Sequence, residues 1–195
     1  MKRLCAITAA VTLTAWAAVA APALKDDKTN LVVNGSFEDG PDIPEDVYKP
    51  LDKGSDAMKG WVVTRGQIDL IGKAHWASAD GNRSLDLHGS PGLGGVMQKI
   101  KTKKGQKYRV TFALSVNSHN TTKAEKSLGV QAAGQQGSFK VEIAGKSVKE
   151  MKWDTKTWDF TATGDETELE FYTLETEEPF GGPALDNVSV TAVSK

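Results

Sequence analysis

The chain has 195 residues and carries 24 Lys and Arg against 25 Asp and Glu, a formal net charge of −1 at pH 7. Charges of both signs are interspersed, so we expect neither nucleic-acid binding nor attraction to anionic membranes. The single cysteine, Cys5, lies near the N-terminus, so the rest of the chain can use neither thiol chemistry nor disulfides.

Residues 1–20 have the form of a secretory signal peptide. The basic residues Lys2 and Arg3 precede an apolar stretch over 4–20, which ends in the small residues Ala18-Val19-Ala20. A membrane anchor is the alternative, but the stretch is slightly short to span a bilayer and is rich in Ala and Thr. We therefore expect cleavage after Ala20, a secreted or periplasmic protein, and no membrane insertion after cleavage.

After a linker over 21–29, the pattern predicts one all-β domain over 30–195. Apolar residues alternate with polar ones in short runs bounded by Gly, Asn, Asp or Pro, which is typical of half-buried strands. The runs include 68–70, 85–87, 96–100, 108–116, 128–130, 139–143, 158–160, 169–171 and 188–190. No segment has a helical period, so we predict an antiparallel β-sandwich or barrel. The segments 39–60, 118–127 and 175–184 are predicted to be loops.

Six motifs, in order along the chain, carry a resemblance to a known family. They are NLVVNGSFEDG (30–40), GWVVTRGQIDLIG (60–72), WASADGNRSLDLHG (76–89), GGVMQKIKTKKGQKYRVTFAL (94–114), TWDFTATGDETELEFYTL (157–174) and GPALDNVSV (182–190). Together they closely resemble the bacterial choice-of-anchor C family, which is similar to the plant cell-wall proteins of the domain-of-unknown-function 642 family.

The resemblance implies a two-sheet jelly roll of the galactose-binding-domain type. It also implies an extracytoplasmic protein that associates with polysaccharide or cell-surface material and has no established catalytic activity. Many family members carry a C-terminal sorting tail, whereas this chain ends at TAVSK soon after the domain. We therefore expect a soluble protein, and the sequence leaves its oligomeric state open.

The resemblance also implies a structural calcium ion, with Glu38 and Asp186 as its carboxylate ligands. In a jelly roll the first and last strands commonly lie close together, and calcium takes six to eight oxygen ligands. Backbone oxygens near Gly35 and in ADGNRS would complete the shell. The alternative is that both are solvated turn acids, or that Asp186 caps a turn through backbone hydrogen bonds.

Tryptophans are the candidate platforms for a sugar, because the apolar faces of sugar rings stack on aromatic rings. Trp61 and Trp158 follow the strand pattern and are expected in the core. Trp76 and Trp153 lie in polar contexts between strands, so they are the preferred ligand-binding candidates, with burial as the alternative for each. Tyr48 and Phe180, in the predicted long loops, are weaker candidates.

A polar surface over 82–95 is the third candidate site. Asp86 and His88 alternate with Leu85 and Leu87, so they point away from the core. With Gln98 they could face a ligand together; the alternative is that all three are ordinary solvent-facing residues.

The motifs of common enzymes are missing. The three histidines are widely spaced, and the sequence has neither an H-E-x-x-H nor a G-x-S-x-G motif. We therefore predict a non-catalytic carbohydrate-binding or cell-envelope-associated module whose partner is a polysaccharide or glycan. A protein-binding scaffold is the alternative, and an unrecognised esterase or glycosidase is a third hypothesis. Two convergent carboxylates in a cleft, one with a raised pKa, would favour the enzyme.

Overall fold

A computed structural model describes residues 29–43, 47–89, 92–119, 123–176 and 181–194. The predicted signal peptide and the linker up to residue 28 lie outside the described residues. Across the described ranges the secondary structure is entirely β, and no helix is long and apolar enough to cross a membrane.

Eleven strands are described, and ten of them coincide with the alternating runs of the sequence or with the segment that follows Trp61. They are β1 (Tyr48–Asp52), β2 (Val62–Arg65), β3 (Gln67–Gly72), β4 (Arg83–Asp86), β5 (Gly95–Lys101), β6 (Lys107–Val116), β7 (Glu125–Ala132), β8 (Gln135–Glu142), β9 (Asp154–Thr161), β10 (Glu166–Thr173) and β11 (Pro183–Ala192).

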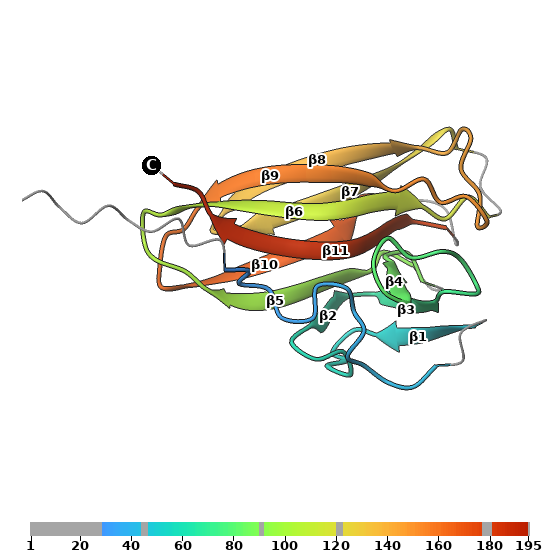
Figure 1. The fold of residues 1–195 in the computed structure, drawn as a ribbon, viewed down its shortest axis with the longest axis horizontal. Helices are drawn as coiled ribbons and strands as arrows, with labels where there is room; N and C mark the ends of the chain where they lie inside the picture. Colours follow the sequence, from blue (N-terminus) through green and yellow to red (C-terminus); the bar gives the residue numbers. More distant parts are fainter. Residues whose placement is uncertain (1–28, 44–46, 90–91, 120–122, 177–180, 195) are drawn as a thin grey trace, which may run out of the picture.

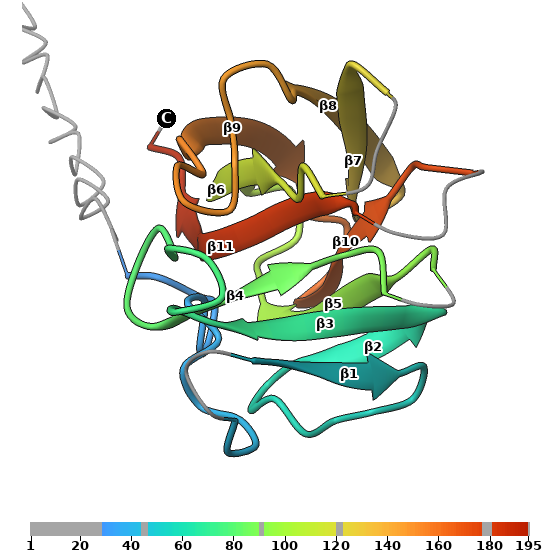
Figure 2. The same cartoon turned by 90° about the vertical axis from the view of Figure 1, so that its right-hand side faces the viewer.

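The strands form two antiparallel sheets that pack face to face (Figures 1 and 2). The first has six strands in the order β1-β3-β4-β11-β6-β9, and the second has five in the order β2-β5-β10-β7-β8. This arrangement confirms the predicted two-sheet sandwich. The last strand, β11, lies between β4 and β6 in the middle of the six-stranded sheet.

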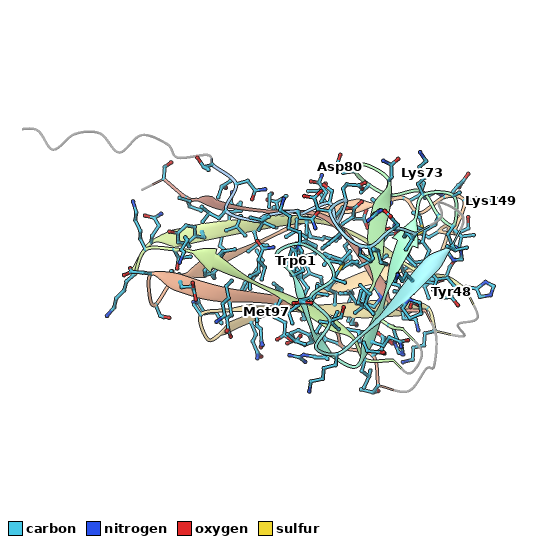
Figure 3. All side chains as sticks on the ribbon, turned by 90° about the horizontal axis from the view of Figure 1, so that it is seen from below. Tyr48, Trp61, Lys73, Asp80, Met97 and Lys149 are labelled. Carbon is cyan, nitrogen blue, oxygen red and sulfur yellow. The ribbon has the colours of Figure 1, made fainter. Side chains whose placement is uncertain are left out.

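The core lies between the sheets and consists of the inward-facing residues of the alternating pattern. Phe112 and Phe171, from different sheets, are fully buried with their ring centroids 5.2 Å apart. Trp61 is 1% exposed, as expected, and Figure 3 labels it near the middle of the view. Trp158 is half-buried and packs against the edge of this core. Burying this apolar surface is the main driving force for folding.

One strand contradicts the sequence analysis. Residues 39–60 were expected to be a surface loop, but 48–52 form β1, which pairs with β3 at the edge of the six-stranded sheet. Only Leu51 of its five residues is buried, so the alternation is too weak to signal a strand. Pro50 is tolerated because proline fits on edge strands, where one side of the backbone needs no partner.

The opening motif lies beside the last strand, as predicted. The amide of Leu31 donates to the carbonyl of Val190 (2.9 Å), and the amide of Val188 donates to the carbonyl of Gly35 (2.9 Å). A Cβ on Gly35 would lie 2.0 Å from the carbonyl oxygen of Val188, so only glycine permits this approach.

Asp186 and Glu38 hold the two ends of the loop over 79–83, an arrangement that we call the clasp. The Asp186 Oδ2 atom accepts hydrogen bonds from the amides of Ala79 (2.7 Å) and Asp80 (2.9 Å). The Glu38 Oε1 atom accepts from the amides of Asn82 (2.7 Å) and Arg83 (2.8 Å). The clasp thus joins the N-terminal segment and β11 to a loop from the middle of the chain.

Two further features fix the geometry of the clasp. Gly81, at the centre of the loop, has φ +63°, and a Cβ there would lie 2.4 Å from Glu38 Oε1. Asp186 is fully buried, and its Oδ1 also accepts the amide of Asn187 (2.7 Å). Burial raises the pKa of Asp186 to about 7, while its three amide donors act in the opposite direction.

Replacing Asp186 by Ala should cost about 1–3 kcal/mol of unfolding free energy, because the loop amides lose their acceptor in a site shielded from water. Urea denaturation measures this loss. Asp39→Ala is the control, since Asp39 is exposed and its ion pair with Lys59 should contribute less than about 1 kcal/mol. Equal losses in the two variants would contradict a structural role for the clasp.

Candidate functional site

A cavity of about 490 Å³ opens on the outer face of the six-stranded sheet. Ile68 and Leu70 of β3 point into the core, so the alternate residues of β3 point to the outer face. The described lining residues are Tyr48, Pro50, Gln67, Asp69, Ile71, His75, Asp86, His88, Gly89, Asn117, His119, Val148 and Gly181. Asp86 and His88 were predicted to share a site, and the structure brings both to this cavity with the other two histidines.

Two carboxylates, Asp69 on β3 and Asp86 on β4, form the floor of the cavity. They lie directly opposite each other in the antiparallel register. Side chains in such positions are close neighbours on one face of a sheet. Burial and the neighbouring Asp86 raise the pKa of Asp69 from 3.8 to about 7. Burial likewise raises the pKa of Asp86 to about 6.

The two carboxylates differ in their hydrogen bonding. Asp86 is 2% exposed and accepts three donors: the amides of His88 (2.9 Å) and Gly182 (3.1 Å), and the side-chain amide of Asn117 (2.9 Å). The Oδ1 atom of Asp69 is buried and has no hydrogen-bond partner among the described residues. Asp86 is therefore fixed by the protein, whereas the Oδ1 atom of Asp69 is buried at the floor of the cavity without a donor from the described residues.

Tyr48 is the exposed aromatic residue of the cavity. Its side chain is 50% exposed, and its ring meets that of His75 edge-on, with the centroids 5.6 Å apart. Figure 3 shows Tyr48 near one end of the molecule, well away from Trp61 in the interior. Tyr48 is a weak candidate from the sequence, because the residues of β1 lack the alternation of a strand. Phe180, the other weak aromatic candidate, lies outside the described residues.

The two preferred tryptophans are not open platforms. Trp76 is 2% exposed, and its Nε1 donates to Ser84 Oγ (2.7 Å). Trp153 is half-buried, packs against the same small cluster, and donates its Nε1 to the carbonyl of Ala77 (2.9 Å). For Trp76, the alternative of burial is therefore the one that the structure shows. Both rings cover the outer face of the six-stranded sheet and support the loop that carries His75.

Gln98 does not join Asp86 and His88. It lies on β5 of the other sheet, is 3% exposed, and faces inward with Val96 and Ile100. Its side-chain amide forms two hydrogen bonds with the backbone of Val33, at 2.7 and 2.8 Å. Gln98 therefore fixes the N-terminal segment. The alternation with Val96 and Ile100 already indicated an inward position.

The clasp offers a calcium ion few oxygens. Of the four carboxylate oxygens of Glu38 and Asp186, three already accept amide N–H groups, whose positive ends point to where a cation would bind. The described residues contain no group of three or more His, Cys, Asp or Glu that could hold a metal ion. This donor set fits calcium poorly. The ion nevertheless stays a prediction.

A second cavity, of about 510 Å³, lies over the five-stranded sheet, and Thr64, Met97, Gln131 and Glu170 are among its lining residues. Its buried carboxylate is already paired. Glu170 accepts two hydrogen bonds from Arg65 (2.8 and 3.0 Å), one from Thr64 (2.6 Å) and one from Gln131. Among the described lining residues of this cavity, no buried carboxylate oxygen lacks a hydrogen-bond partner as that of Asp69 does.

Asp69→Asn should stabilise the protein at about pH 8, by roughly 2 kcal/mol, and change little at about pH 4. The pKa of Asp69 is 3.8 for the free group and is raised to about 7 in the folded protein. The protonated side chain therefore costs the folded state nothing below pH 3.8, and stability is lost as pH rises towards 7 and the buried carboxyl group becomes charged. Asn stays uncharged throughout. Urea denaturation across this range measures the difference, and a variant less stable than wild type at pH 8 would contradict the assignment.

Comparisons with known proteins agree with the fold and the motifs. Residues 30–191 match the model of the family described as "Protein of unknown function (DUF642)". Halomucin of Haloquadratum walsbyi is 31% identical over 169 residues, which are 85% of this chain and 2% of halomucin. The Arabidopsis thaliana "Protein DUF642 L-galactono-1,4-lactone-responsive gene 1" is 25% identical over 177 residues, 85% of this chain and 44% of that protein. The chain thus spans less than half of either relative.

A solved structure of an arabinose-bound α-L-arabinofuranosidase matches this chain with a TM-score of 0.53 and 15% sequence identity. The match covers 85% of this chain and 27% of the arabinofuranosidase chain. At this identity the likeness concerns the fold alone. Because the family model covers nearly the whole of the predicted domain, the identity of the chain at family level is clear. The chain belongs to the DUF642 family.

Proposed function

We propose that the protein is a non-catalytic carbohydrate-binding domain that acts outside the cytoplasm. The observation that carries the proposal is the cavity on the six-stranded sheet, which combines an exposed aromatic ring with a partly unpaired polar floor. The signal-peptide pattern of residues 1–20 supports export.

The cavity has the chemistry that a sugar requires. A sugar ring offers apolar C–H faces to an aromatic platform, and Tyr48 provides one at the edge of the sheet. Its hydroxyl groups need donors and acceptors, and Asp69 and Gln67 line the same cavity. Concave sites with an apolar wall and a few placed polar groups are typical of small-ligand binding.

A hydrolase is the second candidate, because Asp69 and Asp86 are two convergent carboxylates with raised pKa values in one cavity. The hydrogen bonding argues against catalysis. Asp86 already accepts three hydrogen bonds from the protein, so it is poorly placed to attack a ligand or to exchange a proton with it. The absence of released reducing sugar from every polysaccharide that is bound would support the binding role.

A protein-binding scaffold is the other non-catalytic function to compare with carbohydrate binding. A flat apolar surface would favour it, whereas this cavity is concave and carries carboxylates, imidazoles and amides. The polar lining therefore favours a hydroxyl-rich ligand over a protein surface.

The calcium prediction has a direct test in the melting temperature. An ion bound at the clasp would stabilise the folded state by linkage, so millimolar calcium would then raise the melting temperature by several degrees over that in EDTA. Asp186→Asn would abolish such a rise, and Asp69→Asn would leave it intact. Equal melting temperatures in calcium and in EDTA would mean that the amide hydrogen bonds alone hold the clasp.

Tyr48→Ala should weaken polysaccharide binding at least about tenfold, a loss of about 1.4 kcal/mol, because the stacking platform is removed. Tyr48→Phe should bind within about threefold of wild type, since the ring is retained. Affinity gel electrophoresis over neutral and acidic polysaccharides measures the retardation.

Val33→Ala is the matched control, because Val33 is also 50% exposed but does not line the cavity. Unchanged retardation of Tyr48→Ala, or an equal loss in Val33→Ala, would place any binding elsewhere. No retardation of the folded protein on any polysaccharide would overturn the proposed function.

A further inference from the structure

The charge of the cavity restricts the sugars that can enter it. Asp69 and Asp86 are its only carboxylates among the described lining residues, and no Lys or Arg lines it there. Basic side chains are the usual partners of an anionic ligand, because they offer charge-assisted hydrogen bonds. Among the described lining residues, only the three histidines could therefore bring a positive charge to a negatively charged ligand.

Asp69 needs a hydrogen-bond donor that its strand neighbours do not supply. Pro50 on β1 and Asp86 on β4 flank it in the register, and neither side chain has an N–H group to offer. The side-chain amide of Gln67, two residues away on the same face, donates to Asp52 (2.7 Å). A buried acceptor left without a donor is costly, so this arrangement favours a ligand that brings one.

A sugar hydroxyl is such a donor, whereas the carboxylate of a uronic acid is not. A uronate near Asp69 would add a further negative charge to a partly desolvated site. Like charges placed together in a binding site oppose binding, the more so where water is excluded. The same cavity that accepts a neutral sugar would therefore reject its acidic counterpart.

We propose that this cavity selects neutral sugar units over uronic acids, with Asp69 as the specificity-determining residue. The inference rests on the proposed function, since it names the class of sugar for the same site.

Protonation of Asp69 should relax this selection. At about pH 5 Asp69 gains a proton, becomes uncharged and can donate as well as accept. Asp86 and the imidazoles of His75, His88 and His119 share the cavity, and their protonation acts in the same direction.

Lys126, fully buried on β7, lies close enough to lower the pKa of Asp86. It also lies 3.9 Å from Glu175, so its charge is shared with another carboxylate.

The test compares three forms of one polymer. The neutral polysaccharide that affinity gels retain most strongly is oxidised at C6 to the uronate, and part of this product is converted to the methyl ester. At about pH 8 we expect the neutral polymer and the ester to bind within about threefold of each other. The uronate should bind at least about tenfold more weakly, and this gap should narrow to about threefold near pH 5.

Asp69→Asn removes the charge and keeps the shape. In this variant we expect the ratio of uronate affinity to neutral-polymer affinity at pH 8 to rise at least about tenfold, because the repulsion of the uronate is removed and the neutral hydroxyl loses its charged acceptor. Asp165→Asn is the control, because it makes the same change of charge at an exposed turn outside the cavity. It should leave the affinities for the neutral polymer, the uronate and the methyl ester unchanged.

The outcomes separate the two proposals. A wild-type protein that binds the uronate as tightly as the ester overturns the inference, as does a gap that Asp69→Asn leaves intact. Retention on acidic polysaccharides alone also overturns it, while the proposed carbohydrate binding stands. If no form of any polysaccharide binds the folded protein, the proposed function itself fails.

Discussion

The arrangement of the outer face depends on the buried carboxylate of Asp186. Its hydrogen bonds to the amides of Ala79 and Asp80 fix the start of a loop whose other end is held by Glu38. The segment just before this loop carries Trp76, which packs on the six-stranded sheet, and His75, which contacts Tyr48 at the cavity. The same hydrogen bonds that join the ends of the domain therefore also place one wall of the proposed binding site.

The cavity shows how stability and binding oppose each other in this fold. Facing acids on adjacent strands are unfavourable in an antiparallel sheet, and burial increases their cost. The protein offsets the cost at Asp86 with three hydrogen-bond donors but leaves the Oδ1 atom of Asp69 unpaired among the described residues. Local violations of the rules of folding commonly occur at functional sites. The unpaired oxygen of Asp69 is the strongest such violation in the cavity.

Much of the fold could be predicted from the sequence, because a sheet with one buried face leaves a period of two in the chain. Edge strand β1 was missed, since only Leu51 is buried there. The site was harder to predict. Asp86 and His88 were found from their alternation with buried leucines, and Asp69 carries the same signal between Ile68 and Leu70. Which tryptophan is exposed depends on how loops pack, and alternation along a strand does not encode that packing.

The position of a bound sugar can be located directly by NMR. In a titration of the 15N-labelled protein with a neutral oligosaccharide, a sugar bound in the cavity of the six-stranded sheet should shift the resonances of the backbone amides of Tyr48, Asp69 and Asp86. The amides of Met97 and Gln131, on the outer face of the five-stranded sheet, should stay in place. Shifts confined to Met97 and Gln131 would contradict the assignment of the binding site to the six-stranded sheet.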